Sequence, residues 1–257
     1  QHEDASITIA PARAGKTTML TVPRILDAVG SVLATATKDD IVYLTAHSRI
    51  TRQGANVTVF DPREVSAWPK QARWDPVAGS EDLDEAMKRG IAITAGAKKN
   101  MDTSGNMAFF DQSAGMVMGF FLHAAAMKEG GSMRDVLRWT TDFDNDEPLD
   151  LLNESEDAVL ALWPDRFTTM LRNGADQTKG SLAMTLSVAT SALSSPRVLR
   201  MLCPQEGDDV FDVDEFILSG RDTLYILSET GDTSVAPILT VFTDVIIRRA
   251  QRLGLRQ

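Results

Sequence analysis

The chain has 257 residues, of which 43% are hydrophobic and 24% charged, a composition typical of a globular protein with one large domain or two smaller ones. Its formal net charge of -10 excludes a general attraction to phosphate backbones, so contact with nucleic acid would need a local basic patch or loops gathered in an oligomer. Its single cysteine, Cys203, excludes an internal disulfide and is expected to be a small apolar side chain rather than a reactive thiol.

The amino-terminal part of the chain is expected to alternate strands and helices. Residues 6–10 form a short β-rich run, and a helical pattern begins after Gly15. Apolar runs follow at 31–36 and 57–60, and a helix beginning near Asp39 lies between them. This alternation predicts an α/β fold, with a parallel sheet covered by helices on both faces.

The middle of the chain loses this alternation. The loop after residue 62 contains Trp68 and Trp74 near prolines, and we expect these rings to pin the loop rather than to stack on a base. One strand is expected later, at 223–227. The apolar stretch at 115–127 is shorter than the roughly 20 residues that a membrane span needs. Helical patterns lie at about 81–91, 107–128, 132–139, 158–163, 166–171, 179–193 and 235–253.

Residues 10–18 match the Walker A phosphate-binding pattern, except that Ala10 replaces the leading glycine. The chemistry requires backbone N–H groups aimed at phosphate, an ammonium near its oxygens and a hydroxyl for Mg²⁺. Gly15, Lys16 and Thr17 supply these three, so ATP and Mg²⁺ are the expected cofactors, with Thr17 on the metal. The residues expected at the nucleotide are Ala12, Arg13, Ala14, Gly15, Lys16, Thr17 and Thr18.

ATP hydrolysis also requires a carboxylate that positions Mg²⁺. Asp61 ends the apolar run 57–60 and is one candidate metal ligand, with a strand-end loop role as the alternative. Asp214 and Glu215 form an acidic pair, but Glu215 is expected to open a helix capped by Asp212. The side chains expected to pack inward from that helix are Phe216, Ile217 and Leu218. No convincing Walker B strand is seen, so the catalytic residues stay unknown.

Three other features have plain structural interpretations. His123 lies in an apolar helix without cysteine or histidine partners, which favours a hydrogen-bonded core histidine over a metal ligand. The acidic run at 142–147 is expected to be a solvated loop. A basic group near the carboxyl end of the last helix complements the helix dipole, with contact to DNA or to a neighbour's phosphates as the alternative. Its members are Arg248, Arg249, Arg252 and Arg256.

Short blocks of sequence follow one another along nearly the whole chain in a specific order. The blocks are residues 10–18, Val22-Pro23 with Leu26-Asp27-Ala28, Ala34-Thr35-Ala36-Thr37-Lys38, Val59-Phe60-Asp61-Pro62, Arg73-Trp74-Asp75-Pro76, Phe121-Leu122-His123-Ala124-Ala125-Ala126 and Asp222-Thr223-Leu224-Tyr225-Ile226-Leu227. In this order and spacing they resemble the TraG/TraD-like coupling proteins of conjugative type IV secretion systems.

The resemblance implies a RecA/FtsK-like hexameric ATPase at the cytoplasmic face of the bacterial inner membrane, anchored there by upstream helices. Such motors pass single-stranded DNA with a relaxase or other cargo protein to the components of the secretion channel. They carry an all-α domain inserted into the nucleotide-binding domain. The implied division is a nucleotide-binding domain at 1–130, the inserted domain at 131–201 and the continued nucleotide-binding domain at 202–257. The family places its Walker B pair beyond the last helix, so the chain is expected to be a portion of a longer protein.

Two other functions stay open from the sequence. The chain could be a non-hydrolysing nucleotide-binding or adaptor module. It could also be a small P-loop kinase or GTPase that uses Asp61 for Mg²⁺, although such an enzyme has no use for a large helical insertion.

Overall fold

The computed structural model describes residues 7–9, 11, 14–97, 107–229, 231 and 233–254, with the backbone alone at 107–111. Three strands form a parallel sheet in the order β1-β3-β2: β1 (Val32–Ala36), β2 (Val57–Phe60) and β3 (Thr223–Leu227). Both Val32 and Val57 pair with Thr223, from opposite sides of β3. The strands predicted at 31–36, 57–60 and 223–227 are therefore confirmed.

The first predicted strand is wrong where the structure describes it. Residues 7–9 have no strand conformation, and the side chains of Ile7 and Ile9 are 90% and 93% exposed. Residues 6 and 10 lie outside the described part of the chain. The alternation Ile-Thr-Ile fits a β pattern, but a strand also requires a paired neighbour and a covered face, and this segment has neither here.

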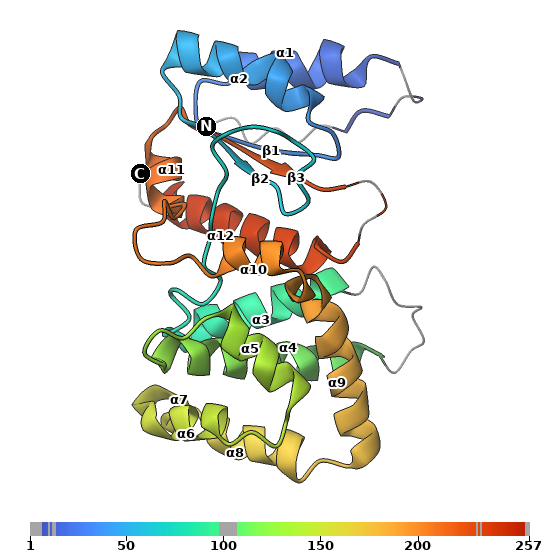
Figure 1. Cartoon of the computed structure of the whole chain (residues 1–257), viewed down its shortest axis with the longest axis vertical. Helices are drawn as coiled ribbons and strands as arrows, with labels where there is room; N and C mark the ends of the chain where they lie inside the picture. Colours follow the sequence, from blue (N-terminus) through green and yellow to red (C-terminus); the bar gives the residue numbers. More distant parts are fainter. Residues whose placement is uncertain are drawn as a thin grey trace.

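One face of the sheet is covered by the first helices of the chain (Figure 1): the π-helical turn η1 (Thr17–Thr21), α1 (Val22–Asp27) and α2 (Asp40–Gln53). The helix predicted after Asp39 is confirmed. It ends where Gly54 takes a left-handed φ of 62° and its N–H caps the last turn. The buried core on this side consists of Ile25, Ile41, Val42, Ala46, Val57, Val59, Tyr225 and Leu227.

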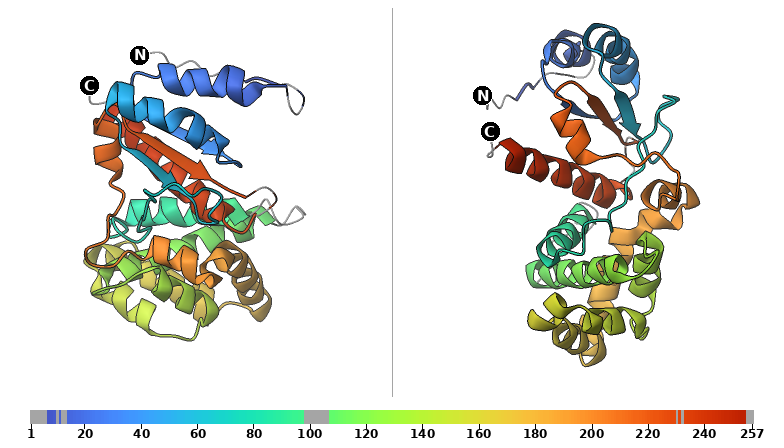
Figure 2. Two further views of the ribbon diagram at one scale, coloured as in Figure 1. Left: turned by 45° about the horizontal axis from the view of Figure 1, so that its top comes forward. Right: turned by 90° about the vertical axis from the view of Figure 1, so that its left-hand side faces the viewer.

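The opposite face is covered by α12 (Ala236–Gly254), with α11 (Val213–Leu218) beside it and α3 (Leu83–Ala97) and α4 (Met107–Met127) beneath (Figures 1 and 2). Phe242 of α12 joins the layers, because its ring centroid lies 4.6 Å from that of Phe60 in β2 and 4.8 Å from that of Trp74 in the loop after β2. Helices thus lie on both faces of the sheet, and the predicted α/β class is confirmed.

The rest of the helices follow one another without a strand; α5 to α9 lie beyond α3 and α4 or along their side, and α10 returns to lie beside α12 (Figure 1). They are α5 (Met133–Thr141), α6 (Glu147–Glu154), α7 (Glu156–Leu160), α8 (Trp163–Phe167), η3 (Thr168–Arg172), α9 (Asp176–Thr190), η4 (Ser191–Ser194) and α10 (Pro196–Leu202). The helix predicted over 158–163 is instead broken at Leu162, which has a left-handed φ of 58°, just before Pro164 in the first turn of α8.

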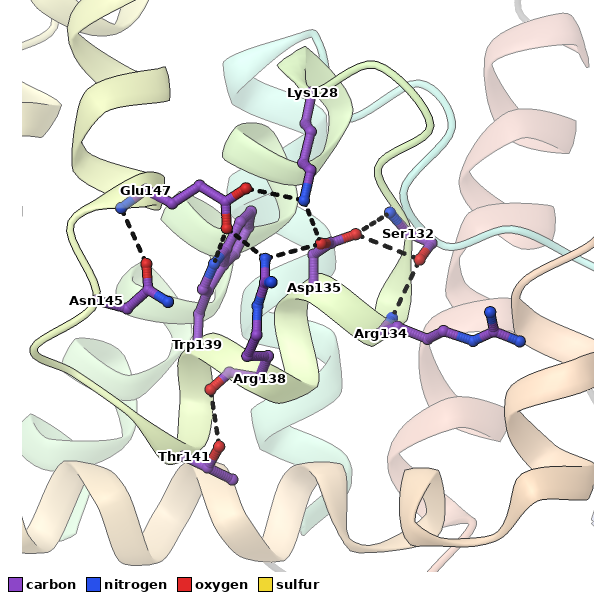
Figure 3. Close-up of polar contacts among 9 residues, drawn as sticks. All are labelled: Lys128, Ser132, Arg134, Asp135, Arg138, Trp139, Thr141, Asn145 and Glu147. Carbon is purple, nitrogen blue, oxygen red and sulfur yellow. Dashed lines mark hydrogen bonds and ion pairs between the residues drawn. The ribbon is translucent and has the colours of Figure 1, made fainter.

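A polar network fixes the first of these helices (Figure 3). Ser132 and Asp135 form a capping box at the start of α5, which confirms Ser132 as the cap. The Lys128 ammonium at the end of α4 lies 2.6 Å from Asp135 and 2.8 Å from Glu147, and Arg138 pairs with the same two carboxylates. Glu147 therefore ties α6 to α4 and α5.

These ion pairs modify the expectation for the acidic run. Asp142, Asp144 and Asp146 are exposed, as expected for a solvated loop. Glu147 instead opens α6, and Asp146 pairs with Arg172 at 2.8 Å. The RecA-like arrangement and the division at 130 and 201 stay predictions. Among the described residues, no helix combines the length and the apolar character needed to cross a membrane.

Candidate nucleotide-binding site

The loop before η1 is a turn that leads directly into a helix. Gly15 has a left-handed φ of 77°, a conformation that glycine adopts without steric cost, and Lys16 already has helical angles. The Met19 N–H donates to the Gly15 carbonyl at 2.8 Å, and the Ala14 N–H donates to the Pro11 carbonyl at 3.4 Å. The helix predicted after Gly15 is thus confirmed, while Ala12 and Arg13 lie outside the described residues.

The side chains of the motif lie close to the loop itself. The Lys16 ammonium donates to the Pro11 carbonyl at 2.7 Å, and the Thr18 hydroxyl donates to the Gly15 carbonyl at 3.2 Å. Thr17 is the first residue of η1 and is partly buried. An ammonium, a hydroxyl and a helix amino terminus are therefore gathered in one short segment, the set that a phosphate and its magnesium require.

The loop lies at the end of the sheet toward which the strands run (Figures 1 and 2). In open α/β sheets, ligands bind in the crevice outside the carboxyl ends of the strands. Asp61, directly after β2, lies at the same end. It is separated from β1 by the width of β3, because β3 is the central strand.

Asp61 is 1% exposed, and its carboxylate holds its own turn. One oxygen accepts the Arg63 N–H at 3.3 Å, and the other accepts the Ser66 N–H at 2.7 Å. This geometry fits the strand-end loop role, and a metal contact for Asp61 stays a prediction. Within the described ranges, no group of three or more histidine, cysteine or acidic side chains could hold a metal ion.

The second acidic candidate has the structural role expected of it. The Asp212 carboxylate caps α11 by accepting the Glu215 N–H at 2.9 Å, and Phe216 is buried. The expectation that Leu218 packs inward is wrong, since this side chain is 62% exposed at the end of a short helix. Asp214 pairs with Arg249 on α12, and the hydrogen bond from this guanidinium lowers the pKa of the Asp214 carboxyl.

The other arginines of α12 are also engaged. Arg248 and Arg252 donate to Glu85 of α3 at 2.7 and 2.5 Å. Burial raises the pKa of Glu85, but the hydrogen bonds from the two guanidiniums outweigh this effect and hold the pKa at about 2. The sequence interpretation did not include these ion pairs, which tie α12 to α3. Arg256 lies outside the described residues.

His123 is a hydrogen-bonded core histidine, as expected. It is 1% exposed, and its ring nitrogens lie 2.9 Å from the Ser80 carbonyl and 2.9 Å from the Ser155 hydroxyl.

The tryptophans and the cysteine also have the expected structural roles. Trp68 donates to the Val57 carbonyl at 3.1 Å, and Trp74 packs on Phe242, so both rings pin their loop. Cys203 is buried, and burial raises the pKa of its thiol.

Sequence reasoning missed two buried arginines. Arg49 of α2 is 0% exposed, and Arg89 of α3 is 7% exposed. For Arg49 a signal existed, because Val42, Thr45 and Arg49 follow one another at helical spacing and must share a face. That face is the one turned toward the sheet.

Comparison with protein families gives one match over nearly the whole chain. Residues 2–253 match the family described as type IV secretory system conjugative DNA transfer. No curated protein matches the chain. The family match agrees with the resemblance to TraG/TraD-like coupling proteins, which the ordered sequence blocks had indicated. The chain therefore belongs to the type IV secretory system conjugative DNA transfer family.

Proposed function

We propose that this chain is the ATP-binding motor portion of a coupling protein that recruits DNA–protein substrates and drives them into a conjugative secretion channel. The observation that carries the proposal is the turn at Gly15, which leads into a helix that begins with Lys16 and Thr17, in a chain of the conjugative DNA transfer family. In this role the Lys16 ammonium contacts the phosphate oxygens of ATP, and the Thr17 hydroxyl binds Mg²⁺.

A RecA-like sheet is part of this proposal, and the topology supports it. Helices α1 and α2 lie on the same face of the sheet (Figure 1), and α2 connects β1 to β2. Because parallel crossovers are almost always right-handed, a strand before α1 would join the sheet beyond β1, away from β3.

The sheet surface on that side is suited to a further strand. Among the described strands, β1 has β3 on one side and none on the other. A groove of about 400 Å³ runs between this edge and α12, and much of its surface is apolar. Its lining includes Thr35, Ile226, Leu239, Thr243 and Ile247.

The remaining parts of the proposal come from the family. They are a homo-hexamer at the cytoplasmic face of the inner membrane, single-stranded DNA, and a relaxase or other cargo protein. Because the net charge is -10 and the described arginines of α12 are paired with carboxylates, DNA would be held by loops gathered around the centre of the hexamer.

A second function is favoured by one observation. Both oxygens of Asp61 accept backbone N–H groups, and Glu215 lies in α11 beside the amino end of β3, away from the loop at Lys16 (Figure 1). Asp61 is thus engaged by its own turn, and Glu215 lies at the wrong end of the sheet to activate water at the loop. A non-hydrolysing nucleotide-binding or adaptor module would need only the loop at Lys16.

Binding of ATP with Mg²⁺ tests the proposal directly. In the Lys16→Ala variant we expect affinity to fall at least about tenfold, because a charge-assisted hydrogen bond to phosphate contributes about 1.5–3 kcal/mol. Titration calorimetry on the whole chain gives the constants. Lys179→Ala is the matched control, since Lys179 pairs with Asp176 on α9, far from the loop in Figure 1, and should leave affinity unchanged. Equal affinity in the native chain and the Lys16 variant would refute the nucleotide site.

Turnover separates the two functions. Phosphate release stimulated by single-stranded DNA, once the chain is extended with the Walker B segment that the family places after the last helix, supports the motor. ATP binding without phosphate release in both the chain and the extended protein, with and without DNA, supports the non-hydrolysing module.

A further inference from the structure

The helical segment that begins with the phosphate-binding loop has few apolar anchors. None of the η1 residues is buried, and α1 buries Ile25 alone. Both elements are fully described. By contrast, α2 buries five residues against the sheet. Apolar packing therefore gives the segment that carries Lys16 and Thr17 only one firm contact.

A polar clamp supplies the rest of its attachment. The Arg49 guanidinium lies between the carboxyl end of α1, the turn that follows it and the start of β3, and it is 0% exposed. Its acceptors are the carbonyl oxygens of Ile25 (3.5 Å), Ala28 (2.7 Å), Gly30 (2.9 Å), Arg221 (2.6 Å) and Asp222 (3.5 Å), and the hydroxyl of Thr223 (2.8 Å).

Gln53, one turn further along α2, completes the clamp. Its side-chain amide donates to the Leu26 carbonyl at 3.2 Å, and its oxygen accepts a hydrogen bond from Arg49. The last turn of α1 leaves carbonyl groups that its own helix cannot satisfy. Arg49 and Gln53 satisfy them from a neighbouring helix, and the cation complements the negative end of the α1 dipole.

This arrangement depends on the shape of the guanidinium. Its N–H groups diverge in a plane and reach α1 on one side and β3 on the other, whereas a lysine ammonium carries all of its donors on one atom. Burial lowers the pKa of Arg49, and the nearby Tyr225 and Asp222 oppose this shift. Most of the hydrogen bonds of the Arg49 cation thus join backbone segments, and the others go to the side chains of Thr223 and Gln53.

We propose that Arg49 is a positioning residue for the phosphate-binding loop, acting by fixing the carboxyl end of α1 against β3. The inference rests on the proposed function. From Ile25 back to Thr17 the helical segment spans roughly 12 Å, so a tilt of about 10° at the clamp moves the loop by about 2 Å. Displacements of this size are large compared with the precision that binding geometry requires.

The test compares two equivalent substitutions in the whole chain, Arg49→Lys and Arg89→Lys. Arg89 is also buried and also donates to carbonyls, those of Pro76 and Ala78, but it lies on α3 on the opposite side of the sheet. Both variants should lower the Tm. At a temperature where all proteins are folded by circular dichroism, Arg49→Lys should weaken ATP–Mg²⁺ binding on the order of tenfold, and Arg89→Lys should leave it unchanged.

Hydrogen exchange supplies a second measurement that does not require nucleotide. In Arg49→Lys, amides of residues 17–29 should exchange faster, while those of 223–227 stay protected. If Arg49→Lys does not fold, Gln53→Ala removes the other half of the clamp and should give a smaller change in the same direction.

The two proposals fail separately. If the native chain binds no nucleotide, the proposed function is refuted, and exchange at 17–29 alone decides whether Arg49 holds α1. If the native chain binds ATP and Arg49→Lys binds it equally well, with unchanged exchange at 17–29, the positioning role is overturned and the nucleotide site stands.

Discussion

His123 shows how a single buried residue can link distant parts of the chain. Its ring joins the Ser80 carbonyl, in the turn before α3, to the Ser155 hydroxyl, which caps α7. A carbonyl accepts only, so the nitrogen facing Ser80 carries the proton and the other nitrogen accepts from Ser155. Desolvation lowers the pKa of His123, although the hydrogen bond to Ser80 and the nearby Glu81 and Asp157 oppose this effect.

This environment predicts a pH dependence of stability. The unfolded chain takes up a proton at His123 near pH 6.5, and the folded chain does so only at lower pH, so the native state loses stability as pH falls below about 6.5. In His123→Gln this contribution is absent. The difference in unfolding free energy between the native chain and the variant should therefore narrow from pH 7 to pH 5, as measured in urea.

His47→Gln is the control for this prediction, because His47 is exposed on α2. The pH dependence found for His123→Gln is compared with that of this variant. A constant difference for His123→Gln would contradict the neutral buried histidine.

At the scale of elements, α3 and α4 cross with their backbones in close approach. A Cβ added to Gly90 would lie 2.3 Å from the Gly115 carbonyl oxygen and 2.5 Å from the Gly119 nitrogen. These contacts are with backbone atoms, which cannot rotate away. Gly90 therefore allows the close approach of α3, which packs under α12, and α4, which supports α5 and α6.

We expect Gly90→Ala to destabilise the chain by at least about 1–3 kcal/mol, the usual cost of overpacking. Gly180→Ala is the matched control, because Gly180 is in α9 and a Cβ there meets nothing within 4 Å. It should stabilise the chain by about 0.5–1 kcal/mol, since alanine favours helix. Thermal unfolding followed by circular dichroism measures both, and a shift of the same sign in the two variants would contradict this account of the crossing.

Among the elements, those with local sequence signals could be predicted, and the long-range pairing of strands could not. The caps at Ser132 and Asp212 and the turn at Gly15 are local signals, so the elements they bound could be predicted. The position of β3 between β1 and β2 depends on pairing across more than 160 residues, for which no local signal exists. Within the candidate site, the sequence also could not show that Asp61 binds the N–H groups of its own turn or that Arg49 binds backbone carbonyls. Every residue has a backbone, so such partners have no signature in the order of residue types.

At the scale of the whole molecule, the sheet separates two cores of unequal extent. The smaller core lies between the sheet and helices α1 and α2. The larger core is continuous from Phe60 and Leu224 in the sheet to Trp139, Leu152 and Phe167 in the helices beyond α4. The helices predicted as an inserted domain thus share their core with the layer beneath the sheet.

A shared core predicts cooperative unfolding of these two regions. In variants that retain only one tryptophan, Trp74 reports on the layer at α12 and Trp139 reports on α5. Within each variant the fluorescence transition in urea should coincide with the transition followed by circular dichroism, because neither region can keep its buried surface without the other. A Trp139 transition that precedes the circular dichroism transition of the same variant would show that the helices beyond α4 fold as an independent domain.

The hydrogen bond between Lys16 and the Pro11 carbonyl has a consequence for affinity. If the proposed function holds, a phosphate must compete with the Pro11 carbonyl for the Lys16 ammonium. The measured affinity then reflects the free energy of the lysine–phosphate contact minus that of the hydrogen bond it replaces. A hydrogen bond to a charged group contributes about 1.5–3 kcal/mol net of the exchange with water, and the one between Lys16 and Pro11 is exposed. The Pro11 carbonyl is then an internal competitor for the ammonium, and a polyphosphate that also engages the helix amino terminus should displace it more readily than a single anion does.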